Sequence, residues 1–490
     1  MKTLRQILQS VTYIHLEGDA EMGVEHLTQD ASTAQKGSLF FAVKGLKTDG
    51  HQYISRAIEK GATVIVCETL PTYYQDHKEV TWVQVPDSRQ VMGYIASSFF
   101  DHPSQKLMLI GVTGTNGKSS VATLLYELFT NLGKQCGLIS TVNYIVSKTT
   151  YTSTHTTPDP IILNTLFHTM VEQGCTYAFM EVSSIAVHQG RINGLQFKGA
   201  LFTNLSHDHL DYHGTFSNYL QCKKQWFDGL SDDAFSLSNT DDKNGKIILQ
   251  NTRSSRYYFG IKKMADFKLK IIESDLNGML LQYKEHEFWV RLTGIFNAYN
   301  LAAVLGTAFL CGFEEEEIII AMSGLKGARG RFETLAGPEK RTGIVDYAHT
   351  PDALKNVLET INRVRTGNET LWVVFGCGGN RDASKRPIMG CIAAQHADRV
   401  VITSDNPRNE KPEQIIQDIQ AGIPAQYFKK ILSITDRAAA IRTAVLTSNP
   451  NDIILVAGKG HETYQIIEDQ KLHFDDASQL NQYFNLLKTP

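Results

Sequence analysis

Short apolar runs, each followed by a polar or glycine-rich loop, recur along most of this chain. Between residues 30 and 68, a strand "SLFFAV", a glycine loop "KGLKTDGH", a helix "YISRAIEKGA" and a strand "TVIVCE" follow one another. Later runs, "KLMLIGVTG", "YAFMEVSS" and "GALFTNLS", also end in polar residues. Continuous apolar strands are typical of parallel sheets, whose ligands bind at the carboxyl ends of the strands. The pattern therefore predicts an α/β fold.

The pattern changes after residue 261. Apolar and polar residues alternate between 262 and 292, which predicts antiparallel strands. The glycine-rich stretch "GLKGARGR" at 324–331 is the expected linker to a further region, in which "TGIVDYAH", "LWVVFGCGG", "DRVVITSDNP" and "DIILVAGKGHE" again place polar loops after strands. We expect three α/β domains: a small N-terminal domain over 1–103, a central domain with a mostly parallel sheet over 104–330, and a Rossmann-like C-terminal domain over 331–490.

Composition and charge exclude several classes of protein. The chain has 490 residues, of which 42% are apolar and 20% charged, as in ordinary globular proteins. A formal net charge of −3 gives no global basic field to attract nucleic acid or anionic lipid. No apolar run reaches the roughly 20 residues of a membrane helix, and the first residues lack the apolar core of a secretory signal. The seven cysteines include no Cys-x-x-Cys pair. We expect a reduced, cytoplasmic protein that binds neither nucleic acid nor membrane.

The stretch "LIGVTGTNGKSS" at 109–120 is similar to a nucleotide-binding loop but has a different glycine spacing. A P-loop reads Gly-x-x-x-x-Gly-Lys-Ser/Thr, whereas Val112 stands at the first of these positions and a glycine precedes it at 111. A strand, a glycine loop and a helix gather backbone N–H groups around an anion. We expect a central sheet of the P-loop ATPase type, with Lys118 at the β- and γ-phosphates of ATP and Ser119 at Mg²⁺. The predicted ATP loop comprises Gly114, Thr115, Asn116, Gly117, Lys118, Ser119 and Ser120; the alternative is a glycine turn with an exposed lysine.

The altered glycine spacing resembles the ATP loop of the Mur ligases and of their folylpolyglutamate synthetase relatives. Further motifs, among them "MEVSS", "LFTNLSHDHLDYHGT", "GIFNAYN", "VDYAHTPDAL", "GCGGNRDASKRP", "DNPRNE" and "VAGKGHE", follow in the order of the Mur ligases that extend UDP-N-acetylmuramoyl-L-alanyl-D-glutamate. The resemblance covers nearly the whole chain. It implies a monomeric, ATP- and Mg²⁺-dependent ligase of peptidoglycan precursor synthesis, which forms an amide bond through an acyl phosphate.

The same resemblance implies a catalytic and metal-binding set. Glu181 follows the strand "YAFM", His209 lies in "DHLDYH", and Lys223 stands where related ligases carry a carbamylated lysine. Carbamylation turns the cation into a carboxylate, whereas an ordinary lysine with a pKa of about 10.4 repels a metal ion. The adjacent Lys224 leaves the register open by one residue, and a lone ionisable residue is more often a solvated or packed side chain. The catalytic set is Lys118, Glu181, His209 and Lys223; the metal set is Ser119, Glu181, His209 and Lys223.

The resemblance also assigns contacts to ATP and to the UDP-muramoyl dipeptide. The expected contacts from outside the loop to ATP are Asn297, Asn300, Arg331, Asp346 and His349. The expected contacts to the dipeptide precursor are Ser32, Thr156, Thr157, Ser184, Gln189, Arg191 and Lys223. The chain departs from the family pattern at Ala31, where a serine is usual, and at Ile185, where a histidine is usual. Both departures bear on binding of the nucleotide sugar and not on the reaction.

The stretch "SDNPRNE" bears on which amino acid is added. Diaminopimelate-adding members carry Asp-Asn-Pro-Arg here, and lysine-adding members generally lack this arginine. meso-Diaminopimelate ends in an ammonium and a carboxylate, and Arg408 and Arg381 can bind that carboxylate with paired N–H donors. Asp405 and Glu462 can bind the ammonium, and Gly458 allows close backbone approach. The predicted diaminopimelate site is Arg381, Asp405, Asn406, Pro407, Arg408, Gly458 and Glu462.

Other interpretations of the sequence compete with this one. A lysine-adding Mur ligase has the same reaction and a different amino-acid pocket. A folylpolyglutamate synthetase shares the ATP chemistry but not the order of "DYHGT", "GCGGNRD" and "DNPR". An ATP-regulated binding module without ligase activity would not require Lys118, Glu181, His209 and Lys223 together. The sequence predicts the diaminopimelate-adding ligase.

Overall fold

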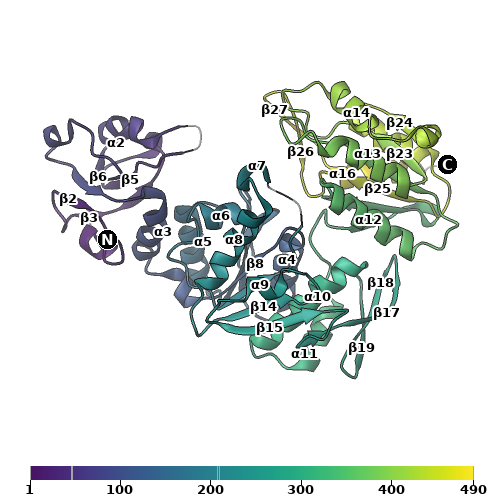
Figure 1. Cartoon of the computed structure of the whole chain (residues 1–490), viewed down its shortest axis with the longest axis horizontal. Coiled ribbons are helices and arrows are strands. Elements are labelled where there is room, and N and C mark those ends of the chain that lie inside the picture. Colours follow the sequence, from purple (N-terminus) through teal and green to yellow (C-terminus); the bar gives the residue numbers. More distant parts are fainter. Residues whose placement is uncertain (1, 46–47, 207, 209, 489–490) are drawn as a thin grey trace. The chain divides into compact units, whose positions relative to one another are not determined.

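The computed structural model describes residues 2–45, 48–206, 208 and 210–488. The chain, drawn in Figure 1, forms two compact units. The first unit comprises Met1–Leu205, His213–Tyr258 and Gly306–Gly312. The second comprises Ser206–Tyr212, Phe259–Leu305 and Phe313–Pro490. Sheets of the α/β kind lie in the N-terminal, middle and C-terminal parts of the chain, as predicted; the domain boundaries at 103/104 and 330/331 stay predictions.

The N-terminal part of the first unit is a five-stranded sheet. Its order is β2 (His15–Glu17), β7 (Thr81–Gln84), β6 (Ala62–Cys67), β5 (Ser38–Phe41) and β4 (His26–Thr28), parallel except for β2. Leu39 and Val64 pack on one face, and Phe40 and Ile65 on the other. Successive side chains of a strand point to opposite sides of the sheet, so neighbouring residues enter two different buried clusters. The helices here are α1 (Leu4–Ile7), α2 (Ile54–Glu59) and α3 (Ser88–Phe99), and β1 (Lys2–Thr3) pairs with β3 (Gly23–Val24).

The middle part is built on a larger sheet with β8 (Met108–Thr113) at its centre. The order is β11 (Thr149–Thr152), β10 (Asn143–Val146), β9 (Cys136–Ile139), β12 (Tyr177–Glu181), β8, β13 (Gly199–Phe202) and β14 (Phe235–Asn239), continuing into β15 (Ser255–Gly260) and β16 (Phe267–Lys268). Strands β9, β12, β8, β13 and β14 are parallel, so their carboxyl ends meet at one edge. The helices here are α4 (Lys118–Asn131), α5 (Pro160–Glu172), α6 (Ser184–His188), α7 (Leu210–His213), α8 (Phe216–Asp228) and α9 (Gly245–Ile248).

The alternating stretch forms an antiparallel sheet, as predicted. Its strands are β17 (Lys270–Asp275), β18 (Gly278–Tyr283) and β19 (His286–Val290). Helices α10 (Ile295–Leu310) and α11 (Glu315–Ser323) follow. The predicted linker at 324–331 contains neither helix nor strand.

The C-terminal part is a six-stranded sheet with helices on both faces (Figure 1). Its order is β20 (Glu333–Ala336), β21 (Thr342–Asp346), β25 (Ile453–Ala457), β22 (Leu371–Phe375), β23 (Arg399–Ile402) and β24 (Ile431–Ser433), in which β20 pairs antiparallel and the others parallel. One face packs against α12 (Pro351–Val364), α13 (Lys385–His396) and α14 (Pro412–Gln420), and the other against α15 (Arg437–Thr447) and α16 (Asp476–Leu486). A hairpin of β26 (Tyr464–Ile467) and β27 (Gln470–His473) follows β25. This is the predicted Rossmann-like arrangement.

Two further observations concern the whole chain. In the part that the structure describes, no helix is long and apolar enough to cross a membrane. All seven cysteines are free thiols, and burial raises the pKa of Cys67, Cys136, Cys311 and Cys377 to about 12. These four thiols are therefore poor nucleophiles at neutral pH.

Candidate active site

The predicted phosphate loop joins the carboxyl end of β8 to the first turn of α4. Gly114 has a φ of 151°, and a Cβ there would lie 1.9 Å from Oγ1 of Thr203. Gly117 caps α4 with a φ of 88°. Side chains other than hydrogen are strained in this left-handed region, so both positions require glycine. The loop ends at a helix N-terminus, as an anion site requires.

The segment after β13 holds this loop in place. The backbone N–H of Thr115 donates to the carbonyl of Asn204 at 2.8 Å, and the N–H of Asn116 donates to Oδ1 of Asn204 at 3.0 Å. The hydroxyl of Thr203 donates to the carbonyl of Asn116 at 2.6 Å. The sequence interpretation missed Thr203 and Asn204, although "LFTNLS" ends a strand with polar residues next to β8.

Lys118 and Lys223 both reach the carbonyls of the loop. The ammonium of Lys118 donates to the carbonyls of Gly114 at 2.9 Å and Thr115 at 2.8 Å. Lys223, which is 1% exposed, donates to the same Gly114 carbonyl at 3.0 Å and to Oγ1 of Thr113 at 3.2 Å. Two cations therefore converge on the start of the loop.

The neighbouring Lys224 turns away from the loop. Its ammonium pairs with the carboxylate of Asp228, one turn further along α8, at 2.6 and 2.8 Å. Successive residues of a helix point about 100° apart, so only one of the two lysines can face the loop. That lysine is Lys223.

Glu181 ends β12, in register with Val112 of β8. Its side chain is fully buried; Oε1 accepts a hydrogen bond from the N–H of Thr141 at 2.7 Å, and Oε2 is a buried atom without a hydrogen-bond partner. An unpaired buried carboxylate oxygen is costly, and a cation would relieve that cost. His209, the other predicted ligand, lies outside the described residues. Among the described residues, no three His, Cys, Asp or Glu side chains form a cluster that could hold a metal ion.

Most of the predicted dipeptide contacts lie close together beside Glu181. The hydroxyl of Thr157 donates to the carbonyl of Glu181 at 2.8 Å, and Nη1 of Arg191 donates to the carbonyl of Thr157 at 2.7 Å. Nε and Nη2 of Arg191 both donate to Oε1 of Gln189, at 3.0 and 2.8 Å. The structure thus joins three of these residues to Glu181 in one network. Thr156 bonds to the hydroxyl of Thr141 at 2.9 Å, and Ser184 to Nε2 of His213 at 2.9 Å.

Ser32 belongs to the N-terminal sheet. Its N–H and hydroxyl donate to Oδ1 of Asp30 at 2.8 and 2.7 Å, and these bonds lower the pKa of that carboxyl. Ser32 is exposed, whereas Ala31 is 6% exposed and packs in the core beside Ala57. The alanine at 31 therefore fills a buried position, and the hydroxyl at 32 stays at the surface.

The other predicted ATP contacts belong to the second unit. Near the start of α10, Nδ2 of Asn297 donates to the carbonyl of Thr293 at 2.9 Å, and Nδ2 of Asn300 donates to Oδ1 of Asn297 at 3.2 Å. Asp346 ends β21, and burial raises the pKa of its carboxyl to about 6. These three side chains are buried and polar.

Tyr347 organises the loop after β21. The guanidinium of Arg331 lies 4.4 Å from the centre of its ring, and the ring of His349 lies 4.5 Å from it. His461, which the sequence interpretation did not single out, packs on the same ring at 5.0 Å, and its Nδ1 is a buried atom without a hydrogen-bond partner. Arg331 and His349 are therefore brought together, and His461 joins them.

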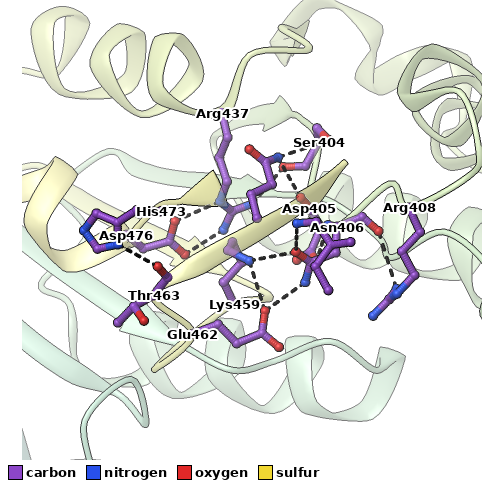
Figure 2. Close-up of polar contacts among 12 residues, drawn as sticks. Ser404, Asp405, Asn406, Arg408, Arg437, Lys459, Glu462, Thr463, His473 and Asp476 are labelled. Carbon is purple, nitrogen blue, oxygen red and sulfur yellow. Dashed lines mark hydrogen bonds and ion pairs between the residues drawn. The ribbon is translucent and has the colours of Figure 1, made fainter. Parts of the chain in front are cut away.

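The loops after β23 and β25 meet at the predicted amino-acid site (Figure 2). The N–H of Asn406 donates to Oδ1 of Asp405 at 2.7 Å, and Nδ2 of Asn406 donates to Oε2 of Glu462 at 2.8 Å. Gly458 has a φ of 113°, and a Cβ there would lie 2.7 Å from Oδ2 of Asp405. The predicted close backbone approach at Gly458 is thus present, against a carboxylate of the site itself.

The two predicted arginines flank Gly378, in the loop after β22. A Cβ at Gly378 would lie 3.0 Å from Nη1 of Arg408 and 3.7 Å from Cγ of Arg381. Nη1 of Arg408 donates to the carbonyl of Gly379 at 2.8 Å. Arg408 has a φ of 52°, which is uncommon for a residue with a side chain. Its unusual backbone, which follows Pro407, therefore directs the guanidinium towards the loop that carries Arg381.

A buried ion pair lies beneath these loops, and the sequence interpretation missed it. Nε and Nη2 of Arg437 donate to Oδ1 and Oδ2 of Asp476, both at 2.8 Å, and both side chains are 0% exposed (Figure 2). Arg437 also donates to the carbonyls of Ser404 at 3.3 Å and Ala457 at 3.0 Å. It therefore ties together the starts of the two loops that carry Asp405 and Gly458.

Three family descriptions match successive parts of this chain. "Mur ligase family, catalytic domain" matches residues 24–100, "Mur ligase middle domain" matches 112–308, and "Mur ligase, glutamate ligase domain" matches 330–460. The chain belongs to the Mur ligase family. The phosphate loop, Glu181 and Lys223 all fall within the match to the middle domain of that family.

Individual Mur ligases are similar to this one over almost their whole length. UDP-N-acetylmuramoyl-L-alanyl-D-glutamate–2,6-diaminopimelate ligase of Cytophaga hutchinsonii is 50% identical over 473 residues, which cover 96% of this chain and 97% of that protein. The ligase of the same name from Bacteroides thetaiotaomicron is 50% identical, with 98% and 100% covered. A solved structure of a UDP-N-acetylmuramoyl-L-alanyl-D-glutamate–2,6-diaminopimelate ligase superposes with a TM-score of 0.71 at 31% identity, with both chains fully covered.

More distant Mur-type structures share the fold alone. MurF from Acinetobacter baumannii gives a TM-score of 0.68 at 16% identity, covering 99% of each chain. Folylpolyglutamate synthase from Mycobacterium tuberculosis gives 0.61 at 16% identity and covers 75% of this chain and 92% of its own. MurF therefore shares the fold of nearly the whole chain and folylpolyglutamate synthase that of three quarters of it, and a shared fold does not fix the substrate, which has to be argued from the site.

Proposed function

We propose that this Mur ligase joins meso-diaminopimelate to UDP-N-acetylmuramoyl-L-alanyl-D-glutamate in peptidoglycan precursor synthesis, with cleavage of ATP. The names of relatives that are 50% identical over nearly the whole chain support this function. The choice of amino acid rests on the arrangement of charged side chains in the predicted amino-acid site. Arg408 and Arg381 flank Gly378, while Asp405 and Glu462 meet through Asn406. Such a site matches a substrate end that bears both a carboxylate and an ammonium.

The reaction has two steps. A carboxylate oxygen of the dipeptide precursor forms a bond to the γ-phosphorus of ATP, and the bond from that phosphorus to ADP breaks. The amine of diaminopimelate then bonds to the acyl carbon, phosphate leaves with the carbon–oxygen bond electrons, and the nitrogen loses a proton. Negative charge gathers on the phosphoryl oxygens in the first step, so catalysis is mainly positioning and cationic stabilisation.

We assign the phosphates to the loop after β8. Gly114 and Gly117, both with positive φ angles, lead from β8 to the N-terminus of α4, and the ammonium of Lys118 lies on the loop at 2.8 to 2.9 Å from two carbonyls. Lys118 would bind the β- and γ-phosphates, and Ser120 and the other residues of the loop at 114–119 would complete the site. Asn297 and Asn300 would bind the adenine end, and Arg331, Asp346 and His349 would act on the same nucleotide.

The residues present fit Mg²⁺, because Oε2 of Glu181 is a buried acceptor without a hydrogen-bond partner. Glu181, the hydroxyl of Ser119, His209 and a carbamylated Lys223 would hold it. When bound, the ion neutralises charge that develops on the transferred phosphoryl group. Thr156, Thr157, Ser184, Gln189, Arg191 and Ser32 would bind the UDP-muramoyl dipeptide; the hydrogen bonds of Arg191 to Gln189 and Thr157, which hold three of them together, support this.

Lys223→Ala is expected to lower phosphate release on the order of 100-fold, the effect of losing one group that stabilises charge in the transition state. Short-chain carboxylates should restore part of the lost rate, because a carbamate would supply a carboxylate at this position. Lys224→Ala is the matched control, since Lys224 pairs with Asp228 and turns away from the loop. A fully active Lys223→Ala variant, or equal losses in the two variants, would exclude the carbamate.

Amino-acid-dependent phosphate release, measured with ATP, the UDP-muramoyl dipeptide and a panel of amino acids, tests the function as a whole. We expect meso-diaminopimelate to be used and lysine to be rejected by up to ~10⁴-fold in kcat/KM, because lysine leaves the arginines unpaired. Release that is fastest with lysine would identify the lysine-adding reaction. No amino-acid-dependent release, or release that requires a folate acceptor, would reject the proposed function.

A further inference from the structure

We propose that Lys459 is a positioning residue of the amino-acid site, which fixes the carboxylate of Glu462 and the amide of Asn406 for the incoming diamino acid. The proposal rests on the proposed function, because it takes Glu462 and Asn406 as contacts to diaminopimelate. Lys459 itself is 0% exposed.

The backbone on both sides of Lys459 turns its side chain inward. Gly458 and Gly460 have φ angles of 113° and 52°, which lie in the left-handed region. A Cβ at Gly460 would lie 2.6 Å from the carbonyl oxygen of Gly330 and 2.7 Å from Cβ of Tyr347. Both positions therefore require glycine. The backbone that they allow places the side chain of Lys459 in the interior and not in an exposed loop.

The ammonium of Lys459 closes a three-membered network of side chains (Figure 2). It donates to Oε2 of Glu462 at 3.0 Å and to Oδ1 of Asn406 at 3.2 Å. Asn406 donates in turn to the same Oε2 at 2.8 Å, and its Oδ1 also accepts the N–H of Ile466 at 2.9 Å. The carboxylate of Glu462 is thus held by two donors through one oxygen. Its side chain remains 15% exposed, so the group stays accessible to a ligand.

Of the two buried cations beneath the site, only Lys459 is placed to hold Glu462 and Asn406. A buried ammonium is costly unless it is paired, and Glu462 is its ion-pair partner at 3.0 Å. The other buried cation in Figure 2, Arg437, is bound by both oxygens of Asp476. Arg437 therefore joins the loops at their base, whereas Lys459 contacts Glu462 and Asn406, the two proposed contacts to the substrate.

Lys459→Met, which keeps the length of the side chain and removes its charge, tests the proposal. Leaving Glu462 untethered should raise the KM for diaminopimelate on the order of 10- to 100-fold. The KM values for ATP and for the UDP-muramoyl dipeptide should change by less than about twofold, since the network touches only the amino-acid site. A rise shared by all three substrates would show a merely structural role and overturn the proposal.

Lys471→Met is the matched control. Lys471 lies 3.9 Å from the centre of the Tyr464 ring and Lys459 lies 5.5 Å from the same ring, but Lys471 is exposed, on β27. Its substitution removes an equal charge beside the same aromatic side chain without touching Glu462. We expect unchanged KM values, and a rise in the KM for diaminopimelate equal to that of Lys459→Met would overturn the proposal.

A double-mutant cycle shows whether Lys459 acts through Glu462. If it does, Lys459→Met/Glu462→Gln should lose no more kcat/KM for diaminopimelate than Glu462→Gln alone. Fold losses that multiply would contradict the proposal. Should Lys459→Met fail to fold, Lys459→Gln/Glu462→Gln, which leaves no unpaired charge, takes its place in the same comparison with the same two outcomes.

The wild-type enzyme separates this inference from the proposed function. If it releases no phosphate with diaminopimelate, the proposed function is wrong and the inference falls with it. If it uses diaminopimelate and Lys459→Met leaves that KM unchanged, the function stands and the inference alone is wrong.

Discussion

Replacing Lys118 by alanine is expected to abolish turnover, with a loss of at least about 10³-fold in phosphate release. Lys118 is the first residue of α4, and its ammonium lies at 2.9 Å from the carbonyl of Gly114 and 2.8 Å from that of Thr115. A cation in this place stabilises the charge that gathers on the transferred phosphoryl oxygens. The neighbouring Lys223 donates to the same Gly114 carbonyl but cannot take over this role if it becomes a carbamate.

The fold should survive the loss of Lys118, because alanine is a good helix former at the start of α4. Thermal unfolding should therefore stay close to wild type. Lys134→Ala, at an exposed lysine just beyond the end of the same helix, is the control and should keep full activity. Near-normal phosphate release by the Lys118 variant would show that the loop after β8 does not bind the phosphates.

Arg408→Ala is expected to reduce kcat/KM for diaminopimelate strongly and to leave the KM values for ATP and the dipeptide precursor unchanged. Losing one charge-assisted contact while the substrate carboxylate remains buried costs on the order of 2–5 kcal/mol. That range corresponds to roughly 30-fold to several-thousand-fold in kcat/KM. Discrimination against lysine should also shrink, because one of the two arginines that lysine leaves unpaired is gone.

Steady-state kinetics for all three substrates check this expectation. Arg399→Ala, an exposed arginine on β23 and therefore on the strand that leads to the same loop, is the matched control and should behave as wild type. If the KM values for ATP and diaminopimelate rose equally in the Arg408 variant, the assignment of the amino-acid specificity would be wrong, while the ligase assignment would stand.

The strands and the loops that follow them could be predicted from the sequence, because each is marked locally. Apolar runs such as "LWVVF" and "DIILVA" became β22 and β25, and the polar residues after them lie in the loops of the proposed amino-acid site. Gly458 was also predictable, since glycine after a strand indicates close backbone approach. The alternation in 262–292 gave an antiparallel sheet for the same local reason.

The pairs that hold the site together could not be predicted, because their partners are distant in sequence. Arg437 and Asp476 are 39 residues apart, and Asn406 and Lys459 are 53 apart. No periodicity links such positions: Arg437 and Asp476 begin the helices α15 and α16, and Asn406 and Lys459 lie in the loops after β23 and β25. For the same reason the sequence, which favoured Lys223, left the register open by one residue to Lys224, and the packing of α8 separates the two lysines.

The glycine at 111, which is part of the unusual glycine spacing, is explained by the packing of helix α8. A Cβ at Gly111 would lie 2.6 Å from the ring of Trp226, three residues after Lys223 on α8. The missing side chain lets the tryptophan ring lie directly on β8, and with it the turn of α8 that extends Lys223 to the loop. The glycines at 111, 114 and 117 thus meet two separate demands: Gly111 makes room for Trp226, and Gly114 and Gly117 take up left-handed backbone. A side chain at position 111 would leave the sequence of the phosphate loop itself unchanged. It would nevertheless impair the loop by displacing Lys223, which is more than a hundred positions away in the sequence.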